Sequence, residues 1–364
     1  MARTGGPFDA VLLISFGGPE GPDEIRPFLR NVLRGRRIPA ERIEAVAHHY
    51  EQFGGRSPIT AITRRQAEGL RARLAAATPD LPVWIGMRNW HPFLDETLAG
   101  MADAGVRRAL GIIMAAQHSY SSCGQYRQNV DDARRALRSA GRPDIEVTYA
   151  GDWHAHPGYV MANAERVAEA RRRLPPELQR DARVVFTAHS IPQSMADACR
   201  YEAELLESAR LVANAAGACD WALTYQSRSG RPQDPWLEPD VYDYLRVERN
   251  RSLAAVVIAP IGFVADHLEV LYDLDTEAAD LCRAMDLPMQ RASAANDHPA
   301  FLDLLAELTR DEWARGGRPL PIVSPDPPAR VEPPPPARRE HAASVQPVMT
   351  PLGTEETVGR WPDG

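Results

Sequence analysis

The sequence predicts an α/β protein with parallel β-sheets. Short apolar runs, each the length of a buried strand, alternate with longer amphipathic patterns typical of helices along most of the 364 residues. Glycine, proline and polar residues separate these runs from the helical patterns that follow them. The two halves of the chain share this rhythm without repeating each other's residues, and the length leaves room for two or three domains.

Seven apolar runs have the length and the β-branched content of strands. Three of them belong to a first unit: 10–15, 82–87 and 108–114. Four of them, each followed by a helical pattern, make a second α/β unit: 145–150, 183–187, 221–225 and 254–259. Helical patterns also cover an arginine-rich segment and the last predicted element: 24–53 and about 299–313.

These elements suggest an N-terminal α/β domain at 1–118 and a C-terminal α/β domain at 119–318. Whether the last helix packs back on the first domain is left open. Residues 319–364 contain proline runs and scattered charges without apolar periodicity, so we expect a Pro-rich disordered tail there.

The composition excludes several classes of chemistry. Apolar residues make up 44% of the chain and charged residues 25%, and a net charge of −7 argues against nucleic-acid binding. No lysine is present, so all 42 basic residues are arginine, and catalysis by a Schiff-base or Walker lysine is impossible. The GxGxxG and GxSxG motifs of dehydrogenases and hydrolases are also missing.

The apolar runs are too short for membrane insertion. None approaches the roughly 18 residues of a membrane span, and the first run is too short for a signal peptide. We therefore expect a cytoplasmic protein without a membrane span. Its cysteines lack CxxC spacing and are expected to be free thiols: Cys123, Cys199, Cys219 and Cys282.

A row of carboxylates follows the strand predicted at 254–259. Glu269, Asp273 and Glu277 recur every fourth residue, and no arginine lies between them. In a regular α-helix this row drifts by about 80° from first to last, and a π-type turn would align it better. The ordinary interpretation is a solvated acidic face, and the alternative is a row with a function.

His189 follows the strand predicted at 183–187. Ligands bind beyond the carboxyl ends of strands in open parallel sheets, and both His189 and Glu269 lie just past such ends. A lone histidine at this place is ordinarily a loop residue. Together, the two residues predict a base and a metal ligand that face one crevice.

Three parts of the sequence resemble the signature blocks of ferrochelatases, which insert ferrous iron into a porphyrin. They are Phe-Thr-Ala-His-Ser-Ile-Pro at 186–192, Tyr-Gln-Ser-Arg-Ser-Gly at 225–230 with Pro-Trp-Leu-Glu-Pro at 235–239, and Gly-Phe-Val-Ala-Asp-His-Leu-Glu-Val-Leu-Tyr-Asp at 262–273. The last block is most similar to the soluble bacterial coproporphyrin ferrochelatases. The resemblance runs from residue 9 to about 312, and implies two similar Rossmann-like, chelatase-type domains with a porphyrin cleft between them.

The resemblance implies roles for the residues at the strand ends. His189 and Glu269 are the expected catalytic pair and ligands of the substrate Fe(II). Asp273 and Glu277 extend from them as an outer path, which carries either iron or protons.

Four further positions are implied to contact the porphyrin. Phe16 stands where some relatives have a tyrosine, so a potential oxygen ligand to iron is missing. Arg34 borders the expected mouth of the cleft. Ser57, in a Gly-Gly-x-Ser-Pro block, and Tyr126 match positions that bind porphyrin propionates.

Cys123 matches a position at which some relatives hold one ligand of a two-iron two-sulfur cluster. The cluster needs three more thiolates, which those relatives supply near the C-terminus, and no cysteine follows Cys282 here. We therefore expect no iron-sulfur cluster and no other tightly bound cofactor.

The resemblance implies insertion of Fe(II) into a porphyrin in haem biosynthesis, with downstream haem-pathway enzymes as expected partners. Coproporphyrin III carries four propionates where protoporphyrin IX carries two, so the arginines at 34–37 and the hydroxyls of Ser57 and Tyr126 favour it. The alternatives are a protoporphyrin IX ferrochelatase, an enzyme that inserts cobalt or nickel into another tetrapyrrole, and a non-catalytic porphyrin- or haem-binding regulator.

Overall fold

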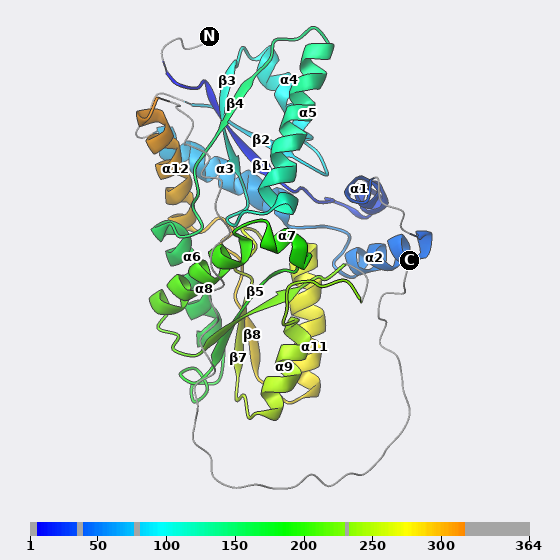
Figure 1. Ribbon diagram of the computed structural model, residues 1–364, viewed down its shortest axis with the longest axis vertical. Helices are drawn as coiled ribbons and strands as arrows, with labels where there is room; N and C mark the ends of the chain where they lie inside the picture. The colour runs from blue at the N-terminus through cyan, green and yellow to red at the C-terminus, as the bar shows by residue number, and fades with distance from the viewer. Residues whose placement is uncertain (1–5, 35–38, 76–80, 230–232, 317–364) are drawn as a thin grey trace.

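The chain folds around two four-stranded parallel sheets (Figure 1). The computed structural model describes residues 6–34, 39–75, 81–229 and 233–316. The first sheet has the order β2-β1-β3-β4: Val83–Met87, Ala10–Ser15, Arg108–Ile113 and Glu146–Tyr149. The second has the order β6-β5-β7-β8: Trp221–Gln226, Arg183–His189, Val256–Ala259 and Met289–Arg291. Because both sheets follow one strand order, the predicted α/β class with two similar units is confirmed.

Helices cover the sheets, as parallel sheets require on both faces. Those of the first half are α1 Ile25–Val32, α2 Ala40–Gln52, α3 Ile59–Ala75, α4 Leu94–Asp103 and α5 Gln125–Ser139. Those of the second half are α6 Pro157–Arg172, α7 Gln193–Asp197, α8 Tyr201–Ala215, α9 Val241–Asn250, α10 Leu268–Val270, α11 Ala279–Ala284 and α12 Pro299–Ala314. A 3-10 turn precedes α1 at Pro22–Glu24, and π-helices precede α5 and α11 at Tyr120–Gly124 and Leu271–Ala278.

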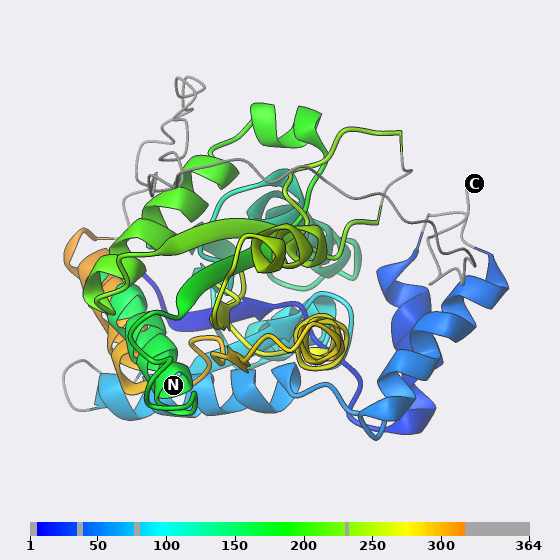
Figure 2. The same cartoon turned by 90° about the horizontal axis from the view of Figure 1, so that it is seen from below.

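The two units share a hydrophobic core. One apolar cluster joins Leu13 and Leu110 of the first sheet to Phe186 and Val257 of the second, and Phe301 of α12 lies within it. The last helix, α12, packs against both α3 and α6. In Figures 1 and 2, by contrast, α1 and α2 stand to one side of both sheets. The shared core therefore fixes the strand ends of the two units relative to each other.

Two strands differ from the prediction. Residues 145–150 were assigned to the second unit, which is wrong: β4 pairs in parallel with β3 in the first sheet. The reason is that α5 packs against α4 and returns the chain to the edge of the sheet it left. The short strand β8, Met-Gln-Arg, was missed because it is only three residues long and has no apolar run. The domain boundary predicted after residue 118 stays a prediction.

Two other expectations concern segments at the margins of the fold. The tail predicted at 319–364 lies outside the described residues, as do Arg36 and Arg37. Within the part of the chain that the structure describes, no helix is both long enough and apolar enough to cross a membrane.

Candidate active site

The site is built on the carboxyl ends of β5, β6 and β7. Strands β5 and β7 are paired in register, so the segments that follow them leave the same edge of the sheet. The loop after β7 passes directly over the end of β5: the Gly262 amide donates to the Thr187 carbonyl at 3.0 Å. A Cβ atom at Gly262 would lie 2.5 Å from the Cβ of Ala188, so this close approach requires glycine.

His189 and Glu269 meet at this edge, as predicted. Nδ1 of His189 lies 2.5 Å from the carbonyl oxygen of Ser190, which can only accept, so Nδ1 carries a proton. Nε2 lies 3.4 Å from Oε1 of Glu269 and presents a lone pair to it when the ring is neutral. That oxygen is buried and has no hydrogen-bond partner among the described residues. With the ring neutral, two acceptors face each other with no donor between them, which is an arrangement that attracts a cation.

Glu269 is held in its ionised form. Burial by itself raises the pKa of this carboxyl, but the charges of His189 and His267 and a hydrogen bond from Ser227 outweigh it and lower the pKa below its ordinary value. The side chains of His189 and Glu269 are nevertheless 36% and 43% exposed, so a substrate can reach them.

Asp273 is shifted in the opposite direction. Burial and then the negative charge of Glu269 raise its pKa well above the ordinary value, which favours the protonated form of this carboxyl. Its Oδ2 accepts hydrogen bonds from Gln226, at 3.0 Å, and from the hydroxyl of Ser227. Two neighbouring acidic groups with separated pKa values are a common property of sites that transfer protons.

The third carboxylate, Glu277, lies at the surface. The hydroxyl of Tyr242 donates to Oε2 of Glu277 at 2.8 Å and lies 3.2 Å from the backbone carbonyl of Asp273. The row therefore runs from Glu269 beside His189, whose pKa is lowered, through the buried Asp273, whose pKa is raised, to the exposed Glu277.

A π-type turn, which would align this row better than a regular α-helix, is present under it. Residues Leu271–Ala278 form a π-helix directly after the short helix α10. An α-helix has fewer than four residues per turn and a π-helix has more, so passing from one to the other keeps residues spaced by four close to one line. The nearby Ser227, with φ of +60°, adopts the left-handed backbone that non-glycine residues rarely adopt.

Two of the expected porphyrin contacts lie on loops that approach this edge. Phe16 packs on a small apolar cluster that contains Ile59 of α3 and Ala265, four residues before Glu269. Ser57 is buried just before α3, and its amide donates to the Pro19 carbonyl at 2.8 Å. The loop after β1 therefore brings Phe16 towards the segment that carries the acidic row, and Ser57 is hydrogen-bonded to the same loop.

The structure places the other two expected contacts in the first unit. Tyr126 is buried in the apolar cluster of the first sheet, with the Arg88 guanidinium 5.9 Å from its ring centre. Arg34 is exposed after α1 and donates to Oδ1 of Asn31 at 2.8 Å. The roles of these residues towards a porphyrin, and the cleft itself, stay predictions.

Sequence reasoning missed several residues of the site. Gln226 and Ser227 lie in the second signature block, which pointed to the segment without assigning them a role. From α2, His49 stacks on Tyr272 of the π-helix, with ring centres 3.7 Å apart and planes at 7°. Burial and then the charge of Glu269 raise the pKa of Tyr50, which is next to His49. Spacing along the chain gave no sign that α2 reaches the acidic row.

Comparison with known proteins decides the family. A family model described as Ferrochelatase matches residues 8–313. The chain belongs to the ferrochelatase family. As a member, it is an enzyme that inserts a metal ion into a porphyrin.

The ferrochelatases it resembles include several bacterial proteins. It is 48% identical over 310 residues to the "Ferrochelatase" of Rhodopirellula baltica, covering 85% of this chain and 87% of that one. It is 45% identical to the "Coproporphyrin III ferrochelatase" of Mycolicibacterium smegmatis, covering 88% and 94%, and 46% identical to that of Mycobacterium marinum, covering 88% and 91%.

Solved structures support the fold of this ferrochelatase. SirB from Bacillus subtilis with Fe3+ superposes with a TM-score of 0.52 at 12% identity, covering 85% of this chain and 96% of that one. The sirohydrochlorin chelatase SirB from Bacillus subtilis subspecies spizizenii, in complex with cobalt, gives a TM-score of 0.51 at 11% identity, covering 85% and 97%. At such low identity these likenesses concern the fold alone.

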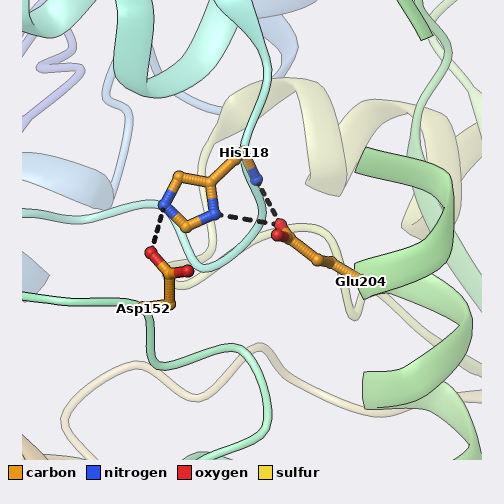
Figure 3. Close-up of side chains that lie close together, drawn as sticks. All are labelled: His118, Asp152 and Glu204. Atoms are coloured by element: carbon orange, nitrogen blue, oxygen red, sulfur yellow. Dashed lines mark hydrogen bonds and ion pairs between the residues drawn. The ribbon is translucent and has the colours of Figure 1, made fainter. Parts of the chain in front are cut away.

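The ferrochelatase contains a second charged cluster, shown in Figure 3, where His118 lies between two carboxylates. Nε2 of His118 is 3.1 Å from Asp152, and Nδ1 is 3.0 Å from Glu204, which also accepts the His118 amide at 2.7 Å. Hydrogen bonds to Asp152 and Glu204 raise the pKa of His118 to about 10. A doubly protonated ring has no lone pair for a metal, so we interpret this cluster as an ion triad that joins α8 to the loop after β3.

This ion triad predicts a pH dependence of stability. The folded pKa of His118 lies above its unfolded value, so its contribution is complete below the unfolded pKa and is lost as pH rises through about 10. We expect the unfolding free-energy difference between wild type and His118→Gln, measured in urea, to shrink steadily from pH 6 to pH 10. His91→Gln, at an exposed histidine, is the control. A difference that stays constant over this range would contradict the triad.

Proposed function

We propose that this enzyme inserts Fe(II) into coproporphyrin III, with His189 and Glu269 at the reacting centre. The observation that supports these roles is the pair of acceptor atoms, Nε2 and Oε1, which face each other 3.4 Å apart without an intervening donor. If each atom binds a metal at about 2.1 Å, as is usual for such ligands, this separation corresponds to an angle of roughly 110° at the metal. One ion can therefore be held by both residues with little movement.

The reaction exchanges one metal dication for two protons. Fe(II) loses its water ligands and binds four pyrrole nitrogens, while the two N–H protons of the free porphyrin leave. A neutral imidazole ligates the arriving ion or accepts a pyrrole proton, and an ionised carboxylate does the same from the other side. The lowered pKa of Glu269 keeps the ionised carboxylate that these steps require.

The outer row suits protons better than iron. The raised pKa of Asp273 favours its uncharged form, which attracts a dication less than a carboxylate does, and Ser227 lies within hydrogen-bond reach of both Glu269 and Asp273. Tyr242 continues the chain of contacts to the exposed Glu277. We infer that protons leave along this row while the metal arrives from the exposed side of Glu269.

Coproporphyrin III is favoured by the relatives and by the charge near the first unit. The enzymes of M. smegmatis and M. marinum, at 45% and 46% identity, carry that substrate in their names. Arg34 is exposed beyond α1 and offers a guanidinium to a propionate. The product, an iron coproporphyrin, would still need a decarboxylase to remove two propionate carboxyl groups.

The proposal includes no iron-sulfur cluster. Four thiolates are the usual requirement, and the cysteines here are dispersed. Cys123 packs against the first sheet, whereas Cys282 is buried in the apolar cluster of the second sheet. A centre that uses both would need a large rearrangement of the core.

The catalytic pair is tested by two substitutions. We expect His189→Ala and Glu269→Gln each to lower the rate of iron insertion about 100-fold or more, because each removes a base or ligand at the reacting centre. Turnover is measured without oxygen, beside circular dichroism to show an intact fold. His91→Ala is the control. Activity within a few-fold of wild type for either site variant would remove the assignment.

Whether the acidic row carries protons or iron is tested at its middle residue. Asp273→Asn keeps the shape of the side chain but cannot pass on a proton, so we expect kcat to fall about tenfold with little change in the KM for Fe(II). Steady-state rates at varied Fe(II) concentration give both values. If the KM for Fe(II) rises instead while kcat is kept, the row carries iron.

The porphyrin preference is tested by comparing kcat/KM for coproporphyrin III and protoporphyrin IX in one detergent. We expect coproporphyrin III to be preferred, and Arg34→Gln to lower its kcat/KM about fivefold, the size of an exposed ion pair. Arg30→Gln, the same charge change one turn earlier on α1, is the matched control. A clear preference of the wild type for protoporphyrin IX would overturn the substrate assignment and leave the catalytic pair untouched.

A further inference from the structure

Arg291 lies at the centre of a charged network beside the helix that carries the acidic row. It is the last residue of β8, and its side chain is only 14% exposed. Nη1 donates to Oδ1 of Asp266 at 2.8 Å, and Nε donates to Oδ1 of Asp275 at 2.6 Å. One guanidinium therefore binds two carboxylates that are nine residues apart, one in the loop just before α10 and one in the π-helix.

Asp266 is held in this network by several further hydrogen bonds. Its carboxylate also accepts from the amide of Ala294, at 3.2 Å, and from the side chain of Asn296, at 2.8 Å. The Asp266 amide donates back to Oδ1 of Asn296 at 2.8 Å. Gln66 of α3 donates to the Asn296 carbonyl at 2.7 Å, which ties this point to the first unit. The start of the helical segment is thus anchored to both halves of the molecule.

Asp275 is the second attachment and lies in the middle of the π-helix Leu271–Ala278. Glu269 and Asp273 lie between the two attachments. A π-helix has poorer hydrogen-bond geometry than an α-helix and seldom persists without support from its surroundings. If this segment wound as an α-helix, the side chains after the change would turn by up to about 100°, the angle of one residue. Asp275 would then leave Arg291, and Asp273 would leave Ser227.

We propose that Arg291 is a positioning residue that holds this segment in its π form by binding Asp266 and Asp275 at once. This double contact of Arg291, here called the clamp, keeps Glu269 facing His189 and Asp273 facing Ser227. Its effect on catalysis rests on the function proposed above for Glu269 and Asp273. Binding both carboxylates requires two separate N–H donors of one planar guanidinium. A lysine, with one compact ammonium, cannot span both carboxylates.

The clamp is tested with two variants and one matched control. Asp275→Asn weakens one attachment at a partly exposed residue and leaves Asp266 paired. Arg291→Lys keeps the positive charge but replaces the two separate N–H donors of the guanidinium with a single ammonium. Asp280→Asn makes the same charge change on α11, where Asp280 pairs with Arg283 at the surface. Each full-length variant is compared with wild type by steady-state kinetics without oxygen and by amide hydrogen exchange of residues 271–278.

We expect Asp275→Asn and Arg291→Lys to lower kcat about tenfold, because small displacements of reacting groups are costly. The KM for the porphyrin should stay within about twofold, since ground-state binding is not the property changed. Amide exchange across 271–278 should become about tenfold faster, because the segment opens locally. Asp280→Asn should match wild type in all three measurements.

Unchanged exchange in 271–278 for both variants would overturn the clamp, whatever the kinetics show. So would a rise in the porphyrin KM with kcat preserved, or an equal loss of kcat in Asp280→Asn. A different measurement would show that the proposed function is wrong: full activity of the Glu269→Gln variant. In that case the exchange rates still decide whether Arg291 supports the π-helix.

Discussion

Repulsion between like charges is the constraint on which this site depends. Three carboxylates on one helix face cannot all be ionised and buried together. The protein gives each a different environment: the charges of two histidines outweigh burial and lower the pKa of Glu269, burial raises the pKa of Asp273, and Glu277 is in solvent. Ser227 and Tyr242 connect these groups by hydrogen bonds. The difference between the pKa values of Glu269 and Asp273 follows from burial together with neighbouring charges, and it is also what a proton path requires.

The fold supplies the edge at which these groups gather. Parallel pairing sends β5, β6 and β7 out at one end, so His189, Ser227 and Glu269 converge although they are far apart in the chain. The shared core and α12 hold the second sheet against the first. The loop with Phe16 and the helix α2 with His49 can therefore reach the acidic row from the other unit.

Errors in the sequence analysis occurred where local pattern is weak. Strand β4 was grouped with the later strands because, like them, it is followed by a helical pattern, yet pairing with β3 placed it in the first sheet. Strand β8 has no apolar run. Its last residue, Arg291, is held by ion pairs and not by burial of apolar surface. The sheet that a strand joins is decided by the strands with which it pairs. A single sequence does not reveal those partners.

The sequence by itself determined the α/β class, the meeting of His189 and Glu269 at one sheet edge, and the acidic row. These follow from residue types at short spacings and from the rule that parallel strands end at one edge. Only the tertiary structure decided that the row lies on a π turn, which nitrogen of His189 faces Glu269, which carboxyl has the raised pKa, and that Arg291 fastens the helix. Each of these depends on burial or on an atom supplied from a distant part of the chain: Ser227 and Gln226 for Asp273, and β8 for the π-helix.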